Sequence, residues 1–237
     1  MRRPLWTFLV ILCMSLTSCI DDFAIFGNGE AATENRWTSA FNEVKVSGEY
    51  EVTIVEGDDY SVAITAESNL LPYIITDNDG SQLKIRTQGI HNLHNTLPMQ
   101  VYITTPYLRG VNLSGSGFIQ TDHFSSSRFN ISLSGSGQIE TSVDTQDMNA
   151  VISGSGQIIV AGYCEHSDLL ISGSGKILSY ELEQSSCDAT ISGSGNMYVN
   201  VENRIEAKIS GSGNVLYINY PEIRSSLSGS GKVINDN

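Results

Sequence analysis

Leu113-Ser114-Gly115-Ser116-Gly117-Phe118-Ile119 contains the tetrapeptide Ser-Gly-Ser-Gly, which occurs seven times in the chain. A fixed period is typical of a repeat architecture. The intervals between copies are 18 to 20 residues, and the copies begin at Ser114, Ser134, Ser153, Ser172, Ser192, Ser210 and Ser228. An apolar residue precedes every copy and another stands two places after it, which a flexible glycine–serine linker would not require. The tetrapeptide therefore marks a structural repeat.

The parity of the apolar residues predicts a closed coil of β-strands. Counted from the first serine of each copy as position zero, positions −3, −1, +5 and +7 are mostly apolar and share their parity with both glycines. Alternate residues of an extended chain face opposite sides, so the glycines and apolar residues face inward and the serines face outward. One closed turn has a perimeter of about 60 Å, so the apolar segment must bend, and we expect the bend at the glycine pair.

Stacked turns of this kind share one continuous core. The predicted fold is all-β: a right-handed, single-stranded parallel β-helix of about seven turns, each of 18–20 residues, over residues 111–237. A β-propeller is excluded because each blade needs about 40 residues or more.

The part of the chain that precedes the repeat is also predicted to be β-structure. Residues 36–110 contain short alternating runs such as Tyr50–Val55, and a hairpin-type turn at Asp77-Asn78-Asp79-Gly80. The pattern leaves open whether this region caps the β-helix with antiparallel hairpins or extends it with irregular early turns. Residues 19–35 are polar and turn-rich, and we expect a flexible tether there.

The N-terminus has the features of a bacterial lipoprotein signal. Arg2 and Arg3 precede an apolar run from Leu5 to Leu16 that is too short to span a membrane comfortably. Leu16-Thr17-Ser18-Cys19 resembles a lipobox, which implies removal of residues 1–18 and lipidation of Cys19. The predicted product is an outer-membrane lipoprotein, held by its acyl chains and facing either the cell surface or the periplasm.

The net charge limits the possible partners, and the cysteines raise the question of a disulfide. Without residues 1–18, the chain keeps 11 basic and 26 acidic residues, a net charge of −15, which disfavours nucleic acid as a partner. An oxidising compartment permits a disulfide between Cys164 and Cys187. The repeat places Cys187 level with Ser167, three positions from Cys164, so a bridge and two free thiols both stay open.

Several of these features together resemble one bacterial family. The seven motifs with their flanking Ile and Leu residues, the lipobox and the leader Val44-Lys45-Val46-Ser47-Gly48 are similar to the putative autotransporter-adhesin "head GIN" domain family. The resemblance covers about residues 40–234. It implies a β-helical fold and a surface or periplasmic setting, and the adhesin label names no ligand.

The sequence offers no catalytic or metal site, and no cofactor is predicted. The residue after each motif is never acidic, unlike in calcium-binding β-rolls. An enzyme that cleaves polysaccharides would need carboxylates on adjacent turns. Four candidates fall at four different positions of the repeat: Glu140, Asp168, Glu181 and Asp188. The chain is therefore not expected to be an enzyme, and a carbohydrate-active enzyme stays the less favoured alternative.

The four histidines form no ligand pattern either. His91 and His94 stand three residues apart in a loop-like stretch without a second ligand pair, and we expect them to be solvated. His123 and His166 stand alone in the repeat region.

One outward position is unusual. Position +6 is polar at Gln120 and Glu140 and then apolar in five consecutive turns, at Ile159, Leu178, Tyr198, Leu216 and Ile234. We call these five residues the apolar strip. Either a return loop or a parity slip buries it, or it is an exposed surface for a protein, a glycan or a second copy of the chain. The predicted function is adhesion or partner binding, and an envelope-structural or self-associating role is the alternative.

Overall fold

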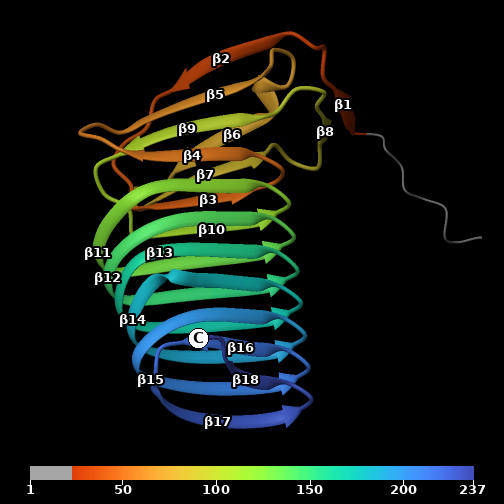
Figure 1. The fold of residues 1–237 in the computed structure, drawn as a ribbon. Coiled ribbons are helices and arrows are strands. Elements are labelled where there is room, and N and C mark those ends of the chain that lie inside the picture. Colours follow the sequence, from red (N-terminus) through yellow and green to blue (C-terminus); the bar gives the residue numbers. More distant parts are fainter. Residues whose placement is uncertain (1–22) are drawn as a thin grey trace, which may run out of the picture.

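The computed structural model describes residues 23–237 (Figure 1). The signal peptide and the lipidation site predicted at Cys19 lie outside these residues. Within the described part of the chain, no helix has the length and apolar character needed to cross a membrane.

The repeat region is a β-solenoid, as predicted. Five long strands each run from one Ser-Gly-Ser-Gly motif to the next: β11 (Phe118–Gly135), β12 (Gln138–Gly154), β13 (Gln157–Gly173), β14 (Lys176–Gly193) and β15 (Asn196–Gly211). Each pairs in parallel with the strand one turn further along, and Figure 1 shows the turns stacked from β10 (Gly110–Gly115) downward. The last full turn is divided into β16 (Asn214–Ile218) and β17 (Glu222–Gly229), and β18 (Lys232–Asn235) begins one further turn by pairing with β16.

The core is a set of stacked aliphatic columns inside the turns. Ile139, Ile158 and Ile177 occupy position +5 of successive turns, lie directly opposite one another and are fully buried. Burial of each such side chain contributes about 1.5–3 kcal/mol relative to exposure. Both serines of every motif are exposed, so the predicted inward and outward assignment is confirmed.

The glycine pair forms the predicted bend, but the neighbouring turn is what requires glycine there. The first glycine of all seven motifs has a φ between +120° and +131°, a conformation that L-residues rarely adopt. A Cβ on Gly135 would lie 2.5 Å from the carbonyl oxygen of Gly115 in the turn before. That oxygen accepts hydrogen bonds from the backbone N–H groups of Ser136 at 3.1 Å and Gly137 at 3.0 Å. A side chain at this position would therefore clash with the backbone of the adjacent turn.

The N-terminal region first extends the solenoid. β3 (Glu43–Ser47) pairs in parallel with β10, and β4 (Glu51–Glu56) pairs in parallel with β11. Tyr50 stands where the repeats have their second glycine, is fully buried, and its hydroxyl lies 2.9 Å from Oγ1 of Thr87. β7 (Gln82–Thr87) and β9 (Gln100–Thr105) add a further parallel layer on β3 and β4.

Antiparallel strands then cap this end. β5 (Ser61–Glu67) pairs with β9, β2 (Ala31–Arg36) with β5, and β6 (Ile74–Asn78) with β7, all antiparallel, and the 3₁₀ turn Leu71–Tyr73 precedes β6. β1 (Ala24–Phe26) pairs in parallel with β8 (Asn92–His94). Region 36–110 therefore contains both early turns and a cap. The prediction of a flexible tether over residues 19–35 is wrong for residues 24–26 and 31–35, which form β1 and most of β2 because open strand edges lie beside them.

A buried carboxylate holds the cap together. Glu67 is fully buried and accepts hydrogen bonds from the backbone N–H of Gly29 at 2.7 Å, and from the N–H and Oγ1 of Thr96 at 2.9 and 2.8 Å. Burial alone would raise the pKa of Glu67, but these donors bring it below its usual value.

Candidate functional site

The apolar strip is a straight column on the outside of the solenoid. Parallel pairing places Ile159 opposite Leu178, Leu178 opposite Tyr198, Tyr198 opposite Leu216, and Leu216 opposite Ile234. The five side chains come from β13, β14, β15, β16 and β18. Neighbouring strands lie about 4.8 Å apart, so the strip is about 19 Å long.

The strip faces outward and is half-buried along its length. Ile158 and Val160 on either side of Ile159 are buried, whereas Ile159 is half-buried, so the alternation continues through the strip. The same alternation holds around Leu178 and Tyr198. The expectation that a parity slip buries the strip is therefore wrong.

Polar groups border the strip on one side. Asn196 and Asn214 precede it at position +4, and Nδ2 of Asn214 donates to Oδ1 of Asn196 at 3.0 Å. The backbone N–H of Lys232 continues the ladder by donating to Oδ1 of Asn214 at 3.2 Å. These hydrogen bonds keep the amides in a row, so the strip has a fixed polar margin.

Tyr180 forms the opposite margin. It lies where β14 bulges relative to β15, and its ring packs edge-on against Tyr198 with the centroids 5.7 Å apart. Its hydroxyl donates to Oδ2 of Asp236 at 2.7 Å. Burial raises the pKa of Tyr180, and the bond to Asp236 raises it further, so the hydroxyl stays protonated and keeps the ring in place.

The last turn leaves part of the core open. All eight residues of β17 are exposed, including Leu227 at 49% and Ile223 at 36%, although both occupy inward positions of the repeat. Among the described strands, β17 pairs only with β15. The solenoid thus ends in an unpaired strand edge beside exposed aliphatic groups.

Cys164 and Cys187 are free and buried. Cys187 lies opposite Ser167, as the repeat predicts, and Cys164 lies opposite Gln184. Burial raises the pKa of Cys164 to about 11 and that of Cys187 to about 12. Both thiols are therefore protonated at neutral pH and serve as core residues.

Of the two cap histidines predicted to be solvated, His94 is exposed as expected, although it lies in β8, whereas His91 is half-buried. His94 stacks on Phe26 with the ring centroids 4.9 Å apart, and His91 packs edge-on against Tyr73 at 5.0 Å. These contacts join β1, β8 and the segment before β6. His91 therefore packs within the cap, and His94 stacks on its surface.

The prediction that the carboxylates are scattered is wrong for one pair. Asp168 of β13 and Asp188 of β14 lie directly opposite each other. Counted from the first serine of the preceding motif, their positions differ by one. The reason is a bulge in β14, which has one extra residue between the pairs Ile159–Leu178 and Gly162–Leu182. Both stand four residues before the next motif, and counting from that motif would have revealed the pair.

Solved structures share this fold. The chain is similar to a "putative adhesin" from Bacteroides fragilis, with 21% identity, a TM-score of 0.84, and coverage of 89% of this chain and 99% of that one. A "putative lipid binding protein" from Parabacteroides distasonis has 24% identity, a TM-score of 0.77, and coverage of 90% and 100%. A "putative adhesin" from Parabacteroides merdae has 21% identity, a TM-score of 0.72, and coverage of 90% and 99%.

None of the curated proteins compared with the chain matches it. A family profile does match, over residues 40–221, which is most of the chain and includes the early turns, the cap without β1 and β2, and six of the seven motifs. The chain therefore belongs to the family described as "Putative auto-transporter adhesin, head GIN domain".

Proposed function

We propose that this protein is a lipid-anchored, non-catalytic binding protein of the bacterial outer membrane that docks a protein partner on the apolar strip. The observation that carries the proposal is the register that aligns Ile159, Leu178, Tyr198, Leu216 and Ile234 in one outward column. The names of the family and of its solved relatives support adhesion or binding in general.

A protein surface suits the strip better than a glycan does. Protein interfaces have an apolar centre with a polar rim, and the strip is bordered by the Asn196–Asn214 ladder on one side and by Tyr180 on the other. Glycan recognition would rely on an open aromatic face. Tyr198 is half-buried and already contacts Tyr180 through its ring.

The anchor rests on the sequence alone. Basic residues, a short apolar run and Leu16-Thr17-Ser18-Cys19 support lipidation of Cys19. Metabolic labelling with a palmitate analogue should mark the wild-type protein and leave Cys19→Ala unlabelled. Equal labelling of both proteins would refute the anchor.

The strip is tested by binding to arrays of host-matrix proteins and glycans. The double variant Leu178→Ser/Leu216→Ser should lose at least tenfold in affinity for the protein that the wild type binds. Leu170→Ser is the matched control, because Leu170 is 37% exposed at position −2, on the other side of the motif. A wild type that binds only glycans, or a double variant that no longer folds by circular dichroism, would overturn this function.

Self-association is a second candidate, favoured by the exposed Leu227 and Ile223 of β17. Two copies pairing through this edge would bury both aliphatic groups. Light scattering after size exclusion should then show a concentration-dependent dimer that Leu227→Glu abolishes. A strict monomer at every concentration would reject this candidate.

A further inference from the structure

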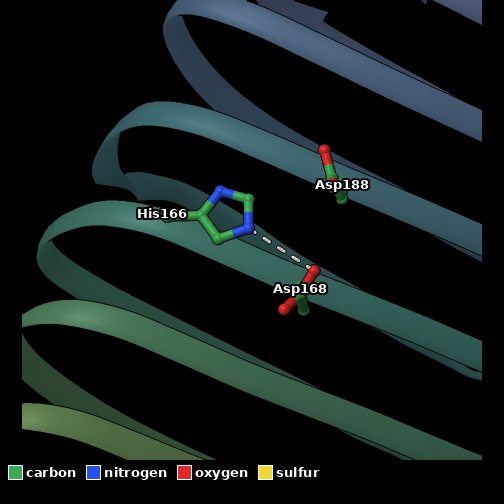
Figure 2. A group of neighbouring side chains, drawn as sticks. All are labelled: His166, Asp168 and Asp188. Atoms are coloured by element: carbon green, nitrogen blue, oxygen red, sulfur yellow. Dashed lines mark ion pairs between the residues drawn. The ribbon is translucent and has the colours of Figure 1, made fainter.

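Three side chains with metal-binding atoms meet on adjacent turns of the solenoid. His166 and Asp168 belong to β13 and Asp188 belongs to β14, and one ligand atom of each lies within 4.8 Å of the other two. Figure 2 shows the imidazole of His166 beside both carboxylates. The group occupies positions −6 and −4, on the other side of the Ser-Gly-Ser-Gly bend from the apolar strip.

The pairing of β13 with β14 places these three residues together. His166 and Asp168 are two residues apart on one strand and therefore face the same side. Asp188 is the residue directly opposite Asp168 on the next strand. Like charges directly opposite in a sheet are destabilising, so the two carboxylates repel each other unless a cation lies between them.

Ser186 orients the imidazole for a ligand role. Nδ1 of His166 lies 3.0 Å from Oγ of Ser186, and Nε2 lies 3.5 Å from Oδ1 of Asp168. In the tautomer that donates from Nδ1 to Ser186, Nε2 carries its lone pair toward the carboxylates. Metal-bound histidines have this arrangement, with the second ring nitrogen hydrogen-bonded to a fixed acceptor.

One oxygen of the group has no hydrogen-bond donor within residues 23–237. Oδ1 of Asp188 is shielded from solvent and accepts no hydrogen bond from the residues that the structure describes. Nη2 of Arg204 lies 3.6 Å away, too far for a hydrogen bond, and Arg204 also approaches Glu206 at 3.9 Å. Arg204 thus forms only a long ion pair with this oxygen, which leaves it without a hydrogen bond from any described residue, beside a second carboxylate and an imidazole, where a metal ion could bind.

We propose that His166, Asp168 and Asp188 bind a divalent transition-metal ion with the ligand preferences of Zn²⁺. One imidazole and two carboxylates match the nitrogen and oxygen ligands of a four-coordinate zinc site with one open position. Calcium needs six to eight oxygen ligands, which three side chains do not supply. Zinc–ligand bonds of about 2.0–2.2 Å require the three side chains to close in, which the exposed Asp168 permits.

The chain contains a matched control histidine. Nδ1 of His123 lies 3.0 Å from Oγ of Ser142, and Nε2 lies 3.5 Å from Oδ2 of Asp144. The imidazole, serine and carboxylate of the proposed site are thus repeated, but the described residues supply no third ligand group there. This site should bind Zn²⁺ far more weakly.

The test is isothermal titration of the purified, tag-free protein with ZnCl₂, together with anomalous diffraction from zinc-soaked crystals. We expect one saturable site, an anomalous peak between His166 and Asp188, and at least a tenfold loss of affinity in His166→Ala and in Asp188→Asn. His123→Ala should bind as the wild type does. Absence of saturable binding, or equal losses in His123→Ala and His166→Ala, would refute the site.

Thermal unfolding supplies an independent readout. Without metal, Asp188→Asn should unfold at about the same temperature as the wild type, because the substitution removes both the repulsion from Asp168 and the long, partly exposed ion pair with Arg204. With Zn²⁺ the wild type should unfold at the higher temperature, because only the wild type gains stability from binding. A variant that is less stable in both conditions would show that Asp188 is structural and would contradict the proposal.

Discussion

Substitution of one glycine in a central Ser-Gly-Ser-Gly motif should destabilise the whole solenoid. In Gly135→Ala the new Cβ would lie 2.5 Å from the carbonyl oxygen of Gly115 and 3.2 Å from its carbonyl carbon. Real Cβ atoms do not approach backbone so closely, so the two turns must separate. Gly135 also has a φ of +120°, where alanine is strained whatever the space.

The magnitude follows from these two effects. A non-glycine residue in this backbone conformation costs about 1–3 kcal/mol. Separation of the turns weakens the hydrogen bonds from the N–H groups of Ser136 and Gly137 to Gly115, each with a net contribution of about 0.5–1.5 kcal/mol. We expect a loss of about 4 kcal/mol, a large part of the 5–15 kcal/mol typical of a folded domain.

Urea unfolding followed by far-UV circular dichroism measures this loss through the shift of the midpoint. Two controls define the mechanism. Ser134→Ala changes an exposed neighbour and should stay within about 0.5 kcal/mol of the wild type. Gly229→Ala makes the same change in the last turn, which can detach alone, so its cost should be no more than about 2 kcal/mol.

Two outcomes would refute this reasoning. A cost below about 1 kcal/mol for Gly135→Ala would mean that the turns adjust without strain. Equal costs for Gly135→Ala and Gly229→Ala would mean that stacking on the adjacent turns does not set the penalty.

Three further predictions concern single side chains. Burial raises the pKa of Cys164 to about 11 and that of Cys187 to about 12, so both thiols should react with a thiol reagent only after denaturation. Prompt reaction in the native state would contradict this prediction. Hydrogen bonds hold the pKa of Glu67 below 4.5, so the stability that its carboxylate gives the cap is present above that pH and is lost as the pH falls. Amide hydrogen exchange in β2 should therefore increase at a higher pH than exchange in β13. An increase at the same pH in both strands would contradict this prediction. Tyr50→Phe removes the bond to Thr87 and should cost about 1–2 kcal/mol in urea unfolding, whereas an unchanged midpoint would show that the hydroxyl is dispensable.

The repeat could be predicted in detail because each turn carries its own information. Alternation along a single strand, such as that around Ile158, shows which residues face inward, and it places both glycines of the motif on the inner side. All seven copies of the motif show this alternation independently. The leader Val44–Gly48 was also visible. The second glycine position of this early bend could not be recognised, because Tyr50 occupies it. Its ring fits against the adjacent turn, where its hydroxyl lies beside Oγ1 of Thr87.

The cap and the side-chain clusters depended on pairing between segments far apart in the sequence. Residues 24–36 read as a tether, since their short polar runs become strands only when β5 and β8 offer edges to pair with. The alignment of Asp168 with Asp188 was missed because a single-residue bulge in β14 shifts the count from the preceding motif, whereas the count from the following motif is the same for both.

The sequence by itself determined the solenoid, its inward and outward faces and the apolar strip, because these depend on alternation along the chain and on a period that repeats. Only the tertiary structure decided that the strip stays half-buried, that Cys164 and Cys187 are unbridged, and that the imidazole of His166 lies beside both aspartates. Those features depend on how side chains pack across neighbouring turns, and alternation along one strand does not determine that packing.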